Sequence, residues 1–333
     1  MSLAFRRKTS LRTKWVISLQ AETRRRSLTR TIGMYLGLAG VIIVFALLSP
    51  YFLSVPNLLN ILVQSSIIAI IAAGQTCVIL TGGIDLSVGS IVAFASVSAG
   101  LMMRDGMSML VVWIIVIAIG MSIGAVNGSV ISFSGVPPFI MTLGMMGIAR
   151  GAALALNGGM PVSGFPPHLE RIASASVMGL PVFVVYTAVV YVIMAIVLNS
   201  TKTGRYLYAV GGNKPAARLS GVNVRAVEVV AYVFSGLFAA IGGMLLTARL
   251  NYATPLAGTG YELDTVAAVV IGGTALSGGK GGVTGTLIGA LMLGTLRNGL
   301  TLLNVSSYYQ QITIGFVIIL AVFFDKASER GRE

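Results

Sequence analysis

Residues 81–90 read Thr-Gly-Gly-Ile-Asp-Leu-Ser-Val-Gly-Ser and interrupt two long apolar runs. A second stretch, residues 272–280, reads Gly-Gly-Thr-Ala-Leu-Ser-Gly-Gly-Lys. When Gly82 and Gly272 are aligned, the two stretches share five of nine positions. Both follow a run rich in Val and Ile, and both precede another apolar run. The chain therefore carries a paired glycine-rich interruption, with one copy in each half.

The composition around these interruptions is that of a membrane protein. Of the 333 residues, 56% are apolar and only 10% are charged, whereas a soluble domain carries about 25% charged residues. The 41 glycines suit helices that pack closely in lipid, and the small-xxx-small spacing of Gly120, Gly124 and Gly128 predicts one helix-packing face. The single Cys77 lies in an apolar run, cannot form an intrachain disulfide and is interpreted as a packing residue. Most of the surface is therefore predicted to face lipid.

Apolar runs of roughly 20 residues are long enough to cross a bilayer as helices. The sequence is consequently predicted to be all-α and polytopic, with about ten transmembrane helices. The first run has no small-x-small cleavage site after it, so we expect it to be retained as a helix. The predicted spans are 33–49, 58–80, 86–103, 108–132, 137–156, 180–198, 227–248, 264–277, 283–303 and 308–324.

The formal net charge of +13 is distributed in a way that indicates membrane orientation. Nine of the 23 Lys and Arg precede residue 31, and five more lie in the interval 199–226. With a cytoplasmic N-terminus and ten spans, both termini are cytoplasmic and most basic residues lie inside, as the positive-inside rule requires. A segment for binding nucleic acid is not indicated. The predicted division is a basic N-terminal segment 1–32, a transmembrane domain 33–325 and a cytoplasmic tail 326–333.

The paired glycine-rich stretches have two interpretations. Gly-interrupted segments in the two halves of a transporter mark broken helices beside a solute pathway, and such backbone must be covered by protein or water. Alternatively, both stretches are tight cytoplasmic turns, with Gly at helix C-termini and Asp85 or Ser87 capping the next helix. The sequence leaves both open. If a weakly polar pathway exists, its candidate residues are Gln75, Asp85, Ser87 and Asn127.

The interval 199–226 contains a short predicted helix over 213–221. Asn213 is a candidate N-cap, Pro215 suits a first turn, and Gly221 stands where a left-handed C-terminal residue is favoured. Such a helix could dock into a partner protein, while the simpler alternative is a solvated basic loop that only enforces topology. The candidate docking residues are Asn213, Ala216, Ala217, Arg218, Leu219 and Gly221.

Two polar intervals are predicted on the other side of the membrane, at 157–179 and 249–264. Either could receive an extracytoplasmic partner or be a simple surface loop. The candidate docking residues there are Arg171, Arg249 and Glu262.

His168 is the only histidine, and neither a metal-ligand spacing nor a catalytic constellation is present. Gly279-Lys280 also lacks the spacing and the Ser or Thr of a phosphate loop. The sequence therefore predicts no metal, no cofactor and no enzymatic activity of its own.

Four stretches together resemble one known family. They are ILTGGIDLSVGS (79–90), GRYLYAVGGNKPAARLSGVNV (204–224), GTGYELDTVAAVVIGGTALSGGKG (258–281) and GTLIGALMLGTLRNGLTLL (285–303). In these stretches, and in SSYYQ (306–310), the chain resembles the ribose-type ABC importer permeases, which carry monosaccharides. The resemblance covers about residues 45 to 325.

The resemblance implies an importer-permease fold of about ten helices in a bacterial inner membrane. It also implies a second permease subunit, an ABC ATPase that is often a fused tandem, and a periplasmic sugar-binding protein. Residues 213–221 match the position of the short cytoplasmic helix through which the ATPase moves the permease. The alternative is a secondary transporter of a small polar solute, coupled to protons or sodium, which needs a buried ionisable residue. Asp85 is the candidate for that role. A scaffold without transport activity is a third alternative.

Overall fold

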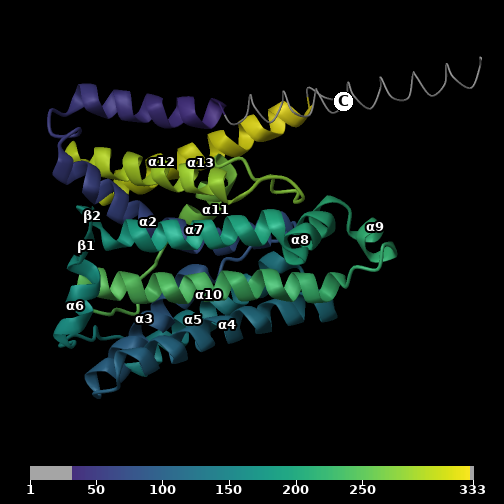
Figure 1. The fold of residues 1–333 in the computed structure, drawn as a ribbon, viewed down its shortest axis with the longest axis horizontal. Coiled ribbons are helices and arrows are strands. Elements are labelled where there is room, and N and C mark those ends of the chain that lie inside the picture. The colour runs from purple at the N-terminus through teal and green to yellow at the C-terminus, as the bar shows by residue number, and fades with distance from the viewer. Residues whose placement is uncertain (1–31, 331–333) are drawn as a thin grey trace, which may run out of the picture.

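The computed structural model describes residues 32–330. The predicted basic N-terminal segment lies outside the described residues up to position 31, as do residues 331–333 at the end of the predicted tail. The described part is a bundle of long helices that run roughly parallel or antiparallel to one another (Figure 1). The helices are Ile32–Leu48, α2 (Val55–Leu80), α3 (Val88–Arg104), α4 (Met109–Ser134), α5 (Pro138–Leu156), α6 (Pro167–Ser174), α7 (Val182–Ser200), α8 (Lys202–Gly212), α9 (Lys214–Leu219), α10 (Val224–Leu250), α11 (Tyr261–Ile271), α12 (Val283–Leu302) and α13 (Ser307–Arg330).

A helix stands at each of the ten predicted spans. By length and composition, five of the described helices could each cross a bilayer, namely α2, α4, α5, α7 and α10. The prediction for 264–277 is too long, because α11 ends at Ile271. Gly273 follows with a φ of 84°, a left-handed conformation that ends the helix.

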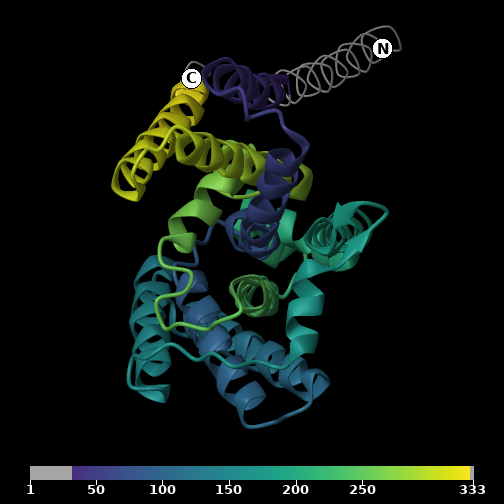
Figure 2. The same ribbon diagram turned by 90° about the vertical axis from the view of Figure 1, so that its left-hand side faces the viewer.

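The helix α10 stands near the centre of the bundle when the molecule is viewed along the helices (Figure 2). Its partner α4 carries Gly120, Gly124 and Gly128 on one face, as the spacing predicts. A methyl group at Gly124 would overlap the carbonyl oxygen of Tyr232 in α10, and one at Gly120 would overlap that of Gly236. The absence of side chains at these positions lets the two backbones touch, which confirms the packing prediction for this face.

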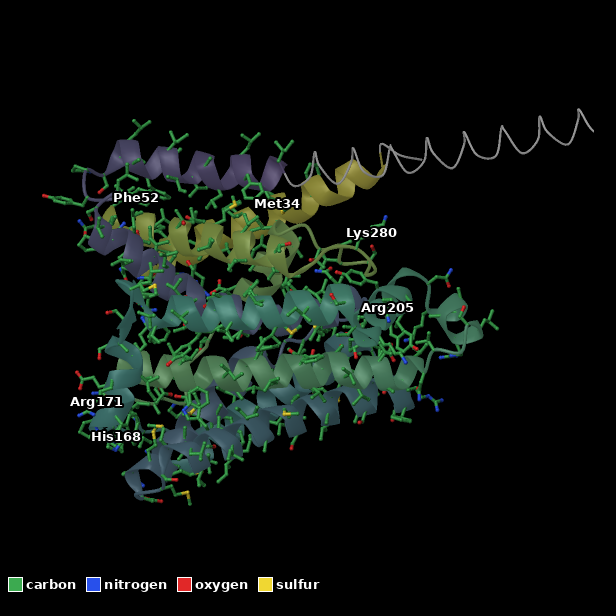
Figure 3. The ribbon with its side chains drawn as sticks, in the orientation of Figure 1. Met34, Phe52, His168, Arg171, Arg205 and Lys280 are labelled. Carbon is green, nitrogen blue, oxygen red and sulfur yellow. The ribbon has the colours of Figure 1, made fainter. Side chains whose placement is uncertain are left out.

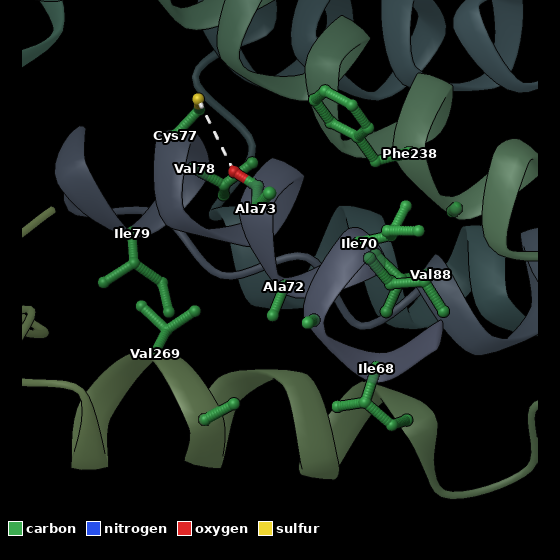
Figure 4. Packing of buried hydrophobic residues seen from close by; sticks show 14 of the residues in the cluster. Ile68, Ile70, Ala72, Ala73, Cys77, Val78, Ile79, Val88, Phe238 and Val269 are labelled. Carbon is green, nitrogen blue, oxygen red and sulfur yellow. Dashed lines mark hydrogen bonds between the residues drawn. The ribbon is translucent and has the colours of Figure 1, made fainter. Parts of the chain in front are cut away.

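The helix α2 supplies most of the apolar core, and its residues 65–80 are all buried. Ile79 packs against Val269 of α11, and Phe238 of α10 lies on the other side (Figure 4). Cys77 is fully buried beside the carbonyl oxygen of Ala73, as a packing residue would be. A helix that is buried on all sides explains why this run is apolar without an amphipathic period.

Two of the intervals between the predicted spans, 157–179 and 199–226, contain more structure than the sequence predicts. The interval 157–179 holds α6 and part of a short antiparallel hairpin, β1 (Ser176–Val177) with β2 (Leu180–Pro181). The interval 199–226 holds two helices, α8 and α9, rather than one. The predicted tail begins inside α13, which continues to Arg330.

The bundle has two ends, which are named here by the short helices that stand at them. His168 and Arg171 of α6 lie at one end, with Phe52 (Figure 3). Arg205 of α8 and Lys280 lie toward the other end, where α9 stands in Figure 1. We call these the α6 end and the α9 end.

Candidate functional site

Both glycine-rich stretches begin as helix C-termini. After α2, Gly82 has a φ of 81°, and after α11, Gly273 has a φ of 84°. In each case the N–H of this glycine and the N–H of the next residue donate to carbonyl oxygens in the last helical turn, which is the hydrogen-bond pattern of a Schellman motif. This part of the turn interpretation is therefore correct for both copies.

The two stretches meet each other and α8 at one junction. The Gly279 N–H donates to the Leu80 carbonyl oxygen over 2.9 Å. A Cβ at Gly278 would lie 2.9 Å from the Gly82 nitrogen and 3.1 Å from the Gly211 backbone. A Cβ at Gly211 would overlap the Leu80 oxygen. We call this contact of Leu80, Gly82, Gly211, Gly278 and Gly279 the glycine junction; it joins three separate chain segments through backbone alone.

Three of the four predicted pathway residues belong to one buried network. The Asp85 carboxylate accepts from the Ser87 N–H (2.9 Å), the Ser87 hydroxyl (2.5 Å) and the Ser235 hydroxyl of α10 (2.7 Å). The Asn127 amide of α4 donates to the Ser87 hydroxyl over 3.0 Å. All four side chains are fully buried. The network thus ties the segment between α2 and α3 to both α4 and α10.

The position of Ser235 on α10 shows how deep in the bundle residues 83–87 lie. Ser235 lies eleven residues from the start of α10, which is about 16 Å along a helix axis at 1.5 Å per residue. The Thr142 hydroxyl of α5 also donates to the Ile84 carbonyl oxygen over 3.2 Å. The backbone of residues 83–87 is therefore non-helical deep inside the bundle and covered by protein, as the broken-helix interpretation requires. Ser87 makes no capping hydrogen bond to α3, so the capping part of the turn interpretation is wrong for it.

Gln75, the fourth predicted pathway residue, lies apart from this network on α2. Its side chain is fully buried, and neither amide atom has a hydrogen-bond partner among the described residues. A buried amide without partners costs free energy, so Gln75 stands out as a group that a solute or water could satisfy.

The short helix α9 has the caps that the sequence predicts. The Asn213 side chain accepts from the Ala216 N–H over 2.9 Å. At the other end, Gly221 has a φ of 83° and its N–H returns to the Arg218 carbonyl oxygen. Ala217 is buried against the bundle, whereas Leu219 is 90% exposed. The capped helix α9 therefore presents Leu219 at the surface of this end of the protein.

Two polar contacts attach this region to the rest of the bundle. The Lys214 ammonium of α9 lies 2.5 Å from the Glu228 carboxylate of α10, whose side chain is only 9% exposed. The Tyr208 hydroxyl of α8 donates to the Gly281 carbonyl oxygen over 2.9 Å. Burial raises the pKa of Tyr208, which keeps this hydroxyl neutral and able to donate. Together with Gly211, these contacts connect α8 and α9 to α10 and to both glycine-rich stretches.

The three residues predicted for extracytoplasmic docking lie near the α6 end but in different environments. Arg171 is exposed on α6. Arg249, near the end of α10, is partly buried and lines a cavity. Glu262 accepts from the Gly260 N–H over 3.3 Å, and its second carboxylate oxygen packs against Gly89. Only Arg171 of these three therefore presents its charge to an approaching protein.

The structure also reveals polar contacts that sequence reasoning missed. Asp264 of α11 and Arg297 of α12 form an ion pair of 2.9 Å. Arg150 of α5 donates to the carbonyl oxygens of Pro255 (2.6 Å) and Ala257 (2.8 Å). The available signal was that all three charges stand within or beside apolar runs, where an ionisable residue marks a functional site or a structural partner. Their partners, however, lie 33 and more than 100 positions away along the chain.

The contacts around α8 and α9 join helices through backbone packing, hydrogen bonds and one ion pair. Among residues 32–330 there is no group of His, Cys, Asp or Glu that could hold a metal ion. The exposed helix α9 is joined through α8 to a glycine junction in which two broken helices meet. The ends of α2 and α11 are thus connected to α9 through α8, and α10 is connected to it through Glu228.

Comparison with known proteins identifies the family. A family model described as "Branched-chain amino acid transport system / permease component" matches residues 57–322. The chain is 45% identical over 293 residues to the ribose import permease protein RbsC of Escherichia coli (strain K12), covering 87% of this chain and 91% of the relative. It is 43% identical over 313 residues to RbsC of Bacillus subtilis (strain 168), covering 92% and 97%.

A further relative is the D-allose transport system permease protein AlsC of Escherichia coli (strain K12), which is 40% identical over 296 residues and is covered over 91% of its length. No solved structure matches this chain. These similarities extend over nearly the whole bundle, including both glycine-rich stretches and α9. The chain therefore belongs to this family of multi-pass inner-membrane permeases, the transport subunits of ABC importers rather than enzymes.

Proposed function

We propose that this chain forms the membrane pathway for a monosaccharide, ribose foremost, which it carries from the periplasm to the cytoplasm. The observation that carries the proposal is the capped helix α9, whose exposed Leu219 adjoins α8 and the glycine junction. The names of the relatives, ribose import and D-allose transport permeases, support the class of substrate.

The proposed assembly contains two copies of this permease as a homodimer. It also contains an ABC ATPase, often a fused tandem, at the α9 end, and a periplasmic sugar-binding protein at the α6 end. Each permease has about ten transmembrane helices, and both termini are cytoplasmic. The excess of Lys and Arg in segments assigned to the cytoplasm supports this orientation. Arg171, exposed on α6, is the proposed contact for acidic groups of the binding protein.

ATP-driven closure of the ATPase is proposed to move α9, with Arg218 and Leu219 as the contact residues. Lys214 transmits the movement to α10 through Glu228, and Gly211 transmits it to both glycine-rich stretches. Asn213 and Gly221 keep α9 in one conformation through its caps. Because these contacts are backbone packing and a short ion pair, α9 and the broken helices would shift together.

The proposed route passes Gln75 and the network of Asp85, Ser87 and Asn127. These side chains are buried here, so the route would open when α10 and α4 move relative to the segment 83–87. Few polar groups suit a pathway, because tight binding would trap the sugar. An Asp85→Asn variant with normal expression tests this role: reduced uptake supports it, and unchanged uptake removes Asp85 from the route.

The test of the whole proposal is ATP hydrolysis by the permease–ATPase complex in liposomes. We expect hydrolysis to rise when the binding protein is added with ribose, and the rise to be lost on changing Arg218 and Leu219 to Ala. Lys202→Ala, an exposed change at the start of α8, is the matched control and should leave the response intact. Uptake that follows an ion gradient, with no associated ATPase, would overturn the proposal.

A further inference from the structure

A cavity of about 130 Å³ opens near the α6 end of the bundle. Its walls come from α2, α10, α11, α12 and α13. One water molecule needs roughly 10–15 Å³ of such space, so the cavity has room for a solute of several heavy atoms. It lies apart from the buried Asp85 network, which is deeper in the bundle.

The cavity wall contains an ion pair between two apolar helices. The Arg297 guanidinium donates to both oxygens of Asp264, over 2.9 and 3.2 Å, and the Asp264 side chain is only 8% exposed. Ionisable residues within membrane segments face the bundle interior or a water-filled cavity, and they mark the paths of solutes. Here the pair fixes a carboxylate and a guanidinium side by side on the cavity surface.

Two further polar groups of the wall have no protein partner. Among the residues whose side chains the structure describes, none forms a hydrogen bond or an ion pair with the Arg249 guanidinium, and none forms a hydrogen bond with the Tyr261 hydroxyl. Gln64 contributes an amide to the same wall, and its only side-chain hydrogen bond is to Asn60 over 3.2 Å. These donors and acceptors are therefore free to bind a molecule in the cavity.

The combination favours a neutral polyhydroxylated solute. Each sugar hydroxyl both donates and accepts, and this wall offers both kinds of group: acceptor oxygens on Asp264 and Gln64, donor groups on Arg249 and Arg297, and both on Tyr261. The Asp264 carboxylate neutralises Arg297, so Arg249 carries the one unpaired charge among these side chains, and an anionic polyol is the competing ligand class that the test must separate. The apolar side chains of Ile68 and Leu293 complete the wall, as is common in small-molecule sites with few polar groups.

We propose that this cavity is a binding site of low affinity for the transported monosaccharide, on the side where the binding protein releases it. The inference rests on the proposed function for the choice of sugar, but not for the existence of the site. Tyr261 and Arg249 each form a hydrogen bond with one hydroxyl group of the sugar. A third hydroxyl group donates to Asp264 and accepts from Arg297.

The test is saturation-transfer NMR of the full-length permease in nanodiscs with ribose, without ATPase or binding protein. We expect ribose to give a saturable signal. Tyr261→Phe and Arg249→Gln each remove hydrogen bonds worth about 1 kcal/mol, so each should weaken ribose binding about fivefold. Ile68→Phe keeps every polar group but adds a ring that fills part of the cavity, so it should abolish the ribose signal. Arg171→Gln, on the surface of α6, is the matched control and should bind ribose normally.

Gluconate, an anionic polyol, shows whether the cavity prefers an anionic ligand to a neutral sugar. The site is overturned if wild-type protein gives no saturable ribose signal, if all three cavity variants bind ribose as wild type does, or if gluconate binds in preference to ribose. Failure of the importer assignment has a different signature. In that case ATP-driven uptake is absent, while ribose still binds to the wild type, about fivefold more weakly to Tyr261→Phe and Arg249→Gln, and not to Ile68→Phe.

Discussion

The α-carbon of Gly211 in α8 lies against the carbonyl oxygen of Leu80 at the end of α2, so that any side chain at position 211 would overlap this oxygen. The same oxygen accepts the hydrogen bond from Gly279. Position 211 is thus one of the positions in the junction that must lack a side chain.

A Gly211→Ala variant is therefore expected to separate α8 from the two glycine-rich stretches. The neighbouring Gly212→Ala is a matched control, because a Cβ there meets nothing within 4 Å. Overpacking of this kind costs roughly 1–3 kcal/mol. We expect Gly211→Ala to assemble with the ATPase but to lose most ribose-stimulated hydrolysis, measured in liposomes, while Gly212→Ala keeps it. Equal stimulation in both variants would show that the junction does not transmit the movement.

The glycine face of α4 makes a prediction about stability. Gly124→Ala would force α4 away from the Tyr232 carbonyl of α10 and should destabilise the protein by roughly 1–3 kcal/mol. Gly147→Ala in α5 meets open space, so it should be neutral or more stable by up to about 1 kcal/mol, since alanine favours the helix. Thermal unfolding in detergent, followed through exposure of Cys77 to a thiol reagent, measures the difference. A Gly124→Ala variant as stable as Gly147→Ala would contradict the close packing.

The Lys214–Glu228 ion pair predicts how firmly α9 is held. Lys214→Ala leaves the buried Glu228 carboxylate without its partner, at a cost of about 1–3 kcal/mol. Amide hydrogen exchange in residues 213–222 should therefore be faster than in the wild type. Glu228→Gln keeps an oxygen acceptor and removes the buried charge, so its exchange should rise less. Identical exchange in all three proteins would mean that Ala217 packing alone holds α9.

The charge of Arg171 predicts a salt-dependent effect on the binding protein. Arg171→Glu reverses an exposed charge on α6 and should weaken docking at low ionic strength, with the difference shrinking as salt screens it. Arg104→Glu changes another exposed arginine, one beside Asp105 after α3, and should weaken docking less. Affinity measured by surface plasmon resonance at two salt concentrations distinguishes the two. Docking that is unaffected by Arg171→Glu at low salt would exclude this residue from the interface.

Local patterns allowed much of this protein to be predicted from its sequence. Apolar run length placed a helix at all ten expected intervals, and the spacing of Gly120, Gly124 and Gly128 indicated a packing face. Each cap of α9 joins residues three positions apart: the Asn213 side chain accepts from the Ala216 N–H, and the Gly221 N–H donates to the Arg218 carbonyl oxygen. Such features depend on residues that are close along the chain, so they can be predicted without knowing the tertiary structure.

Only the tertiary structure decided which distant groups meet. Asp85 accepts a hydrogen bond from Ser235, which is 150 positions away. Gly279 donates a hydrogen bond to Leu80, and Asp264 forms an ion pair with Arg297. The sequence also could not tell that Arg249 lines a cavity while Arg171 faces outward, because both are arginines in polar intervals near one end. Hydropathy and glycine spacing determine that helices form and where they end, since both act on the local chain. The partners of a buried charge are set by the packing of whole helices, which no local pattern encodes.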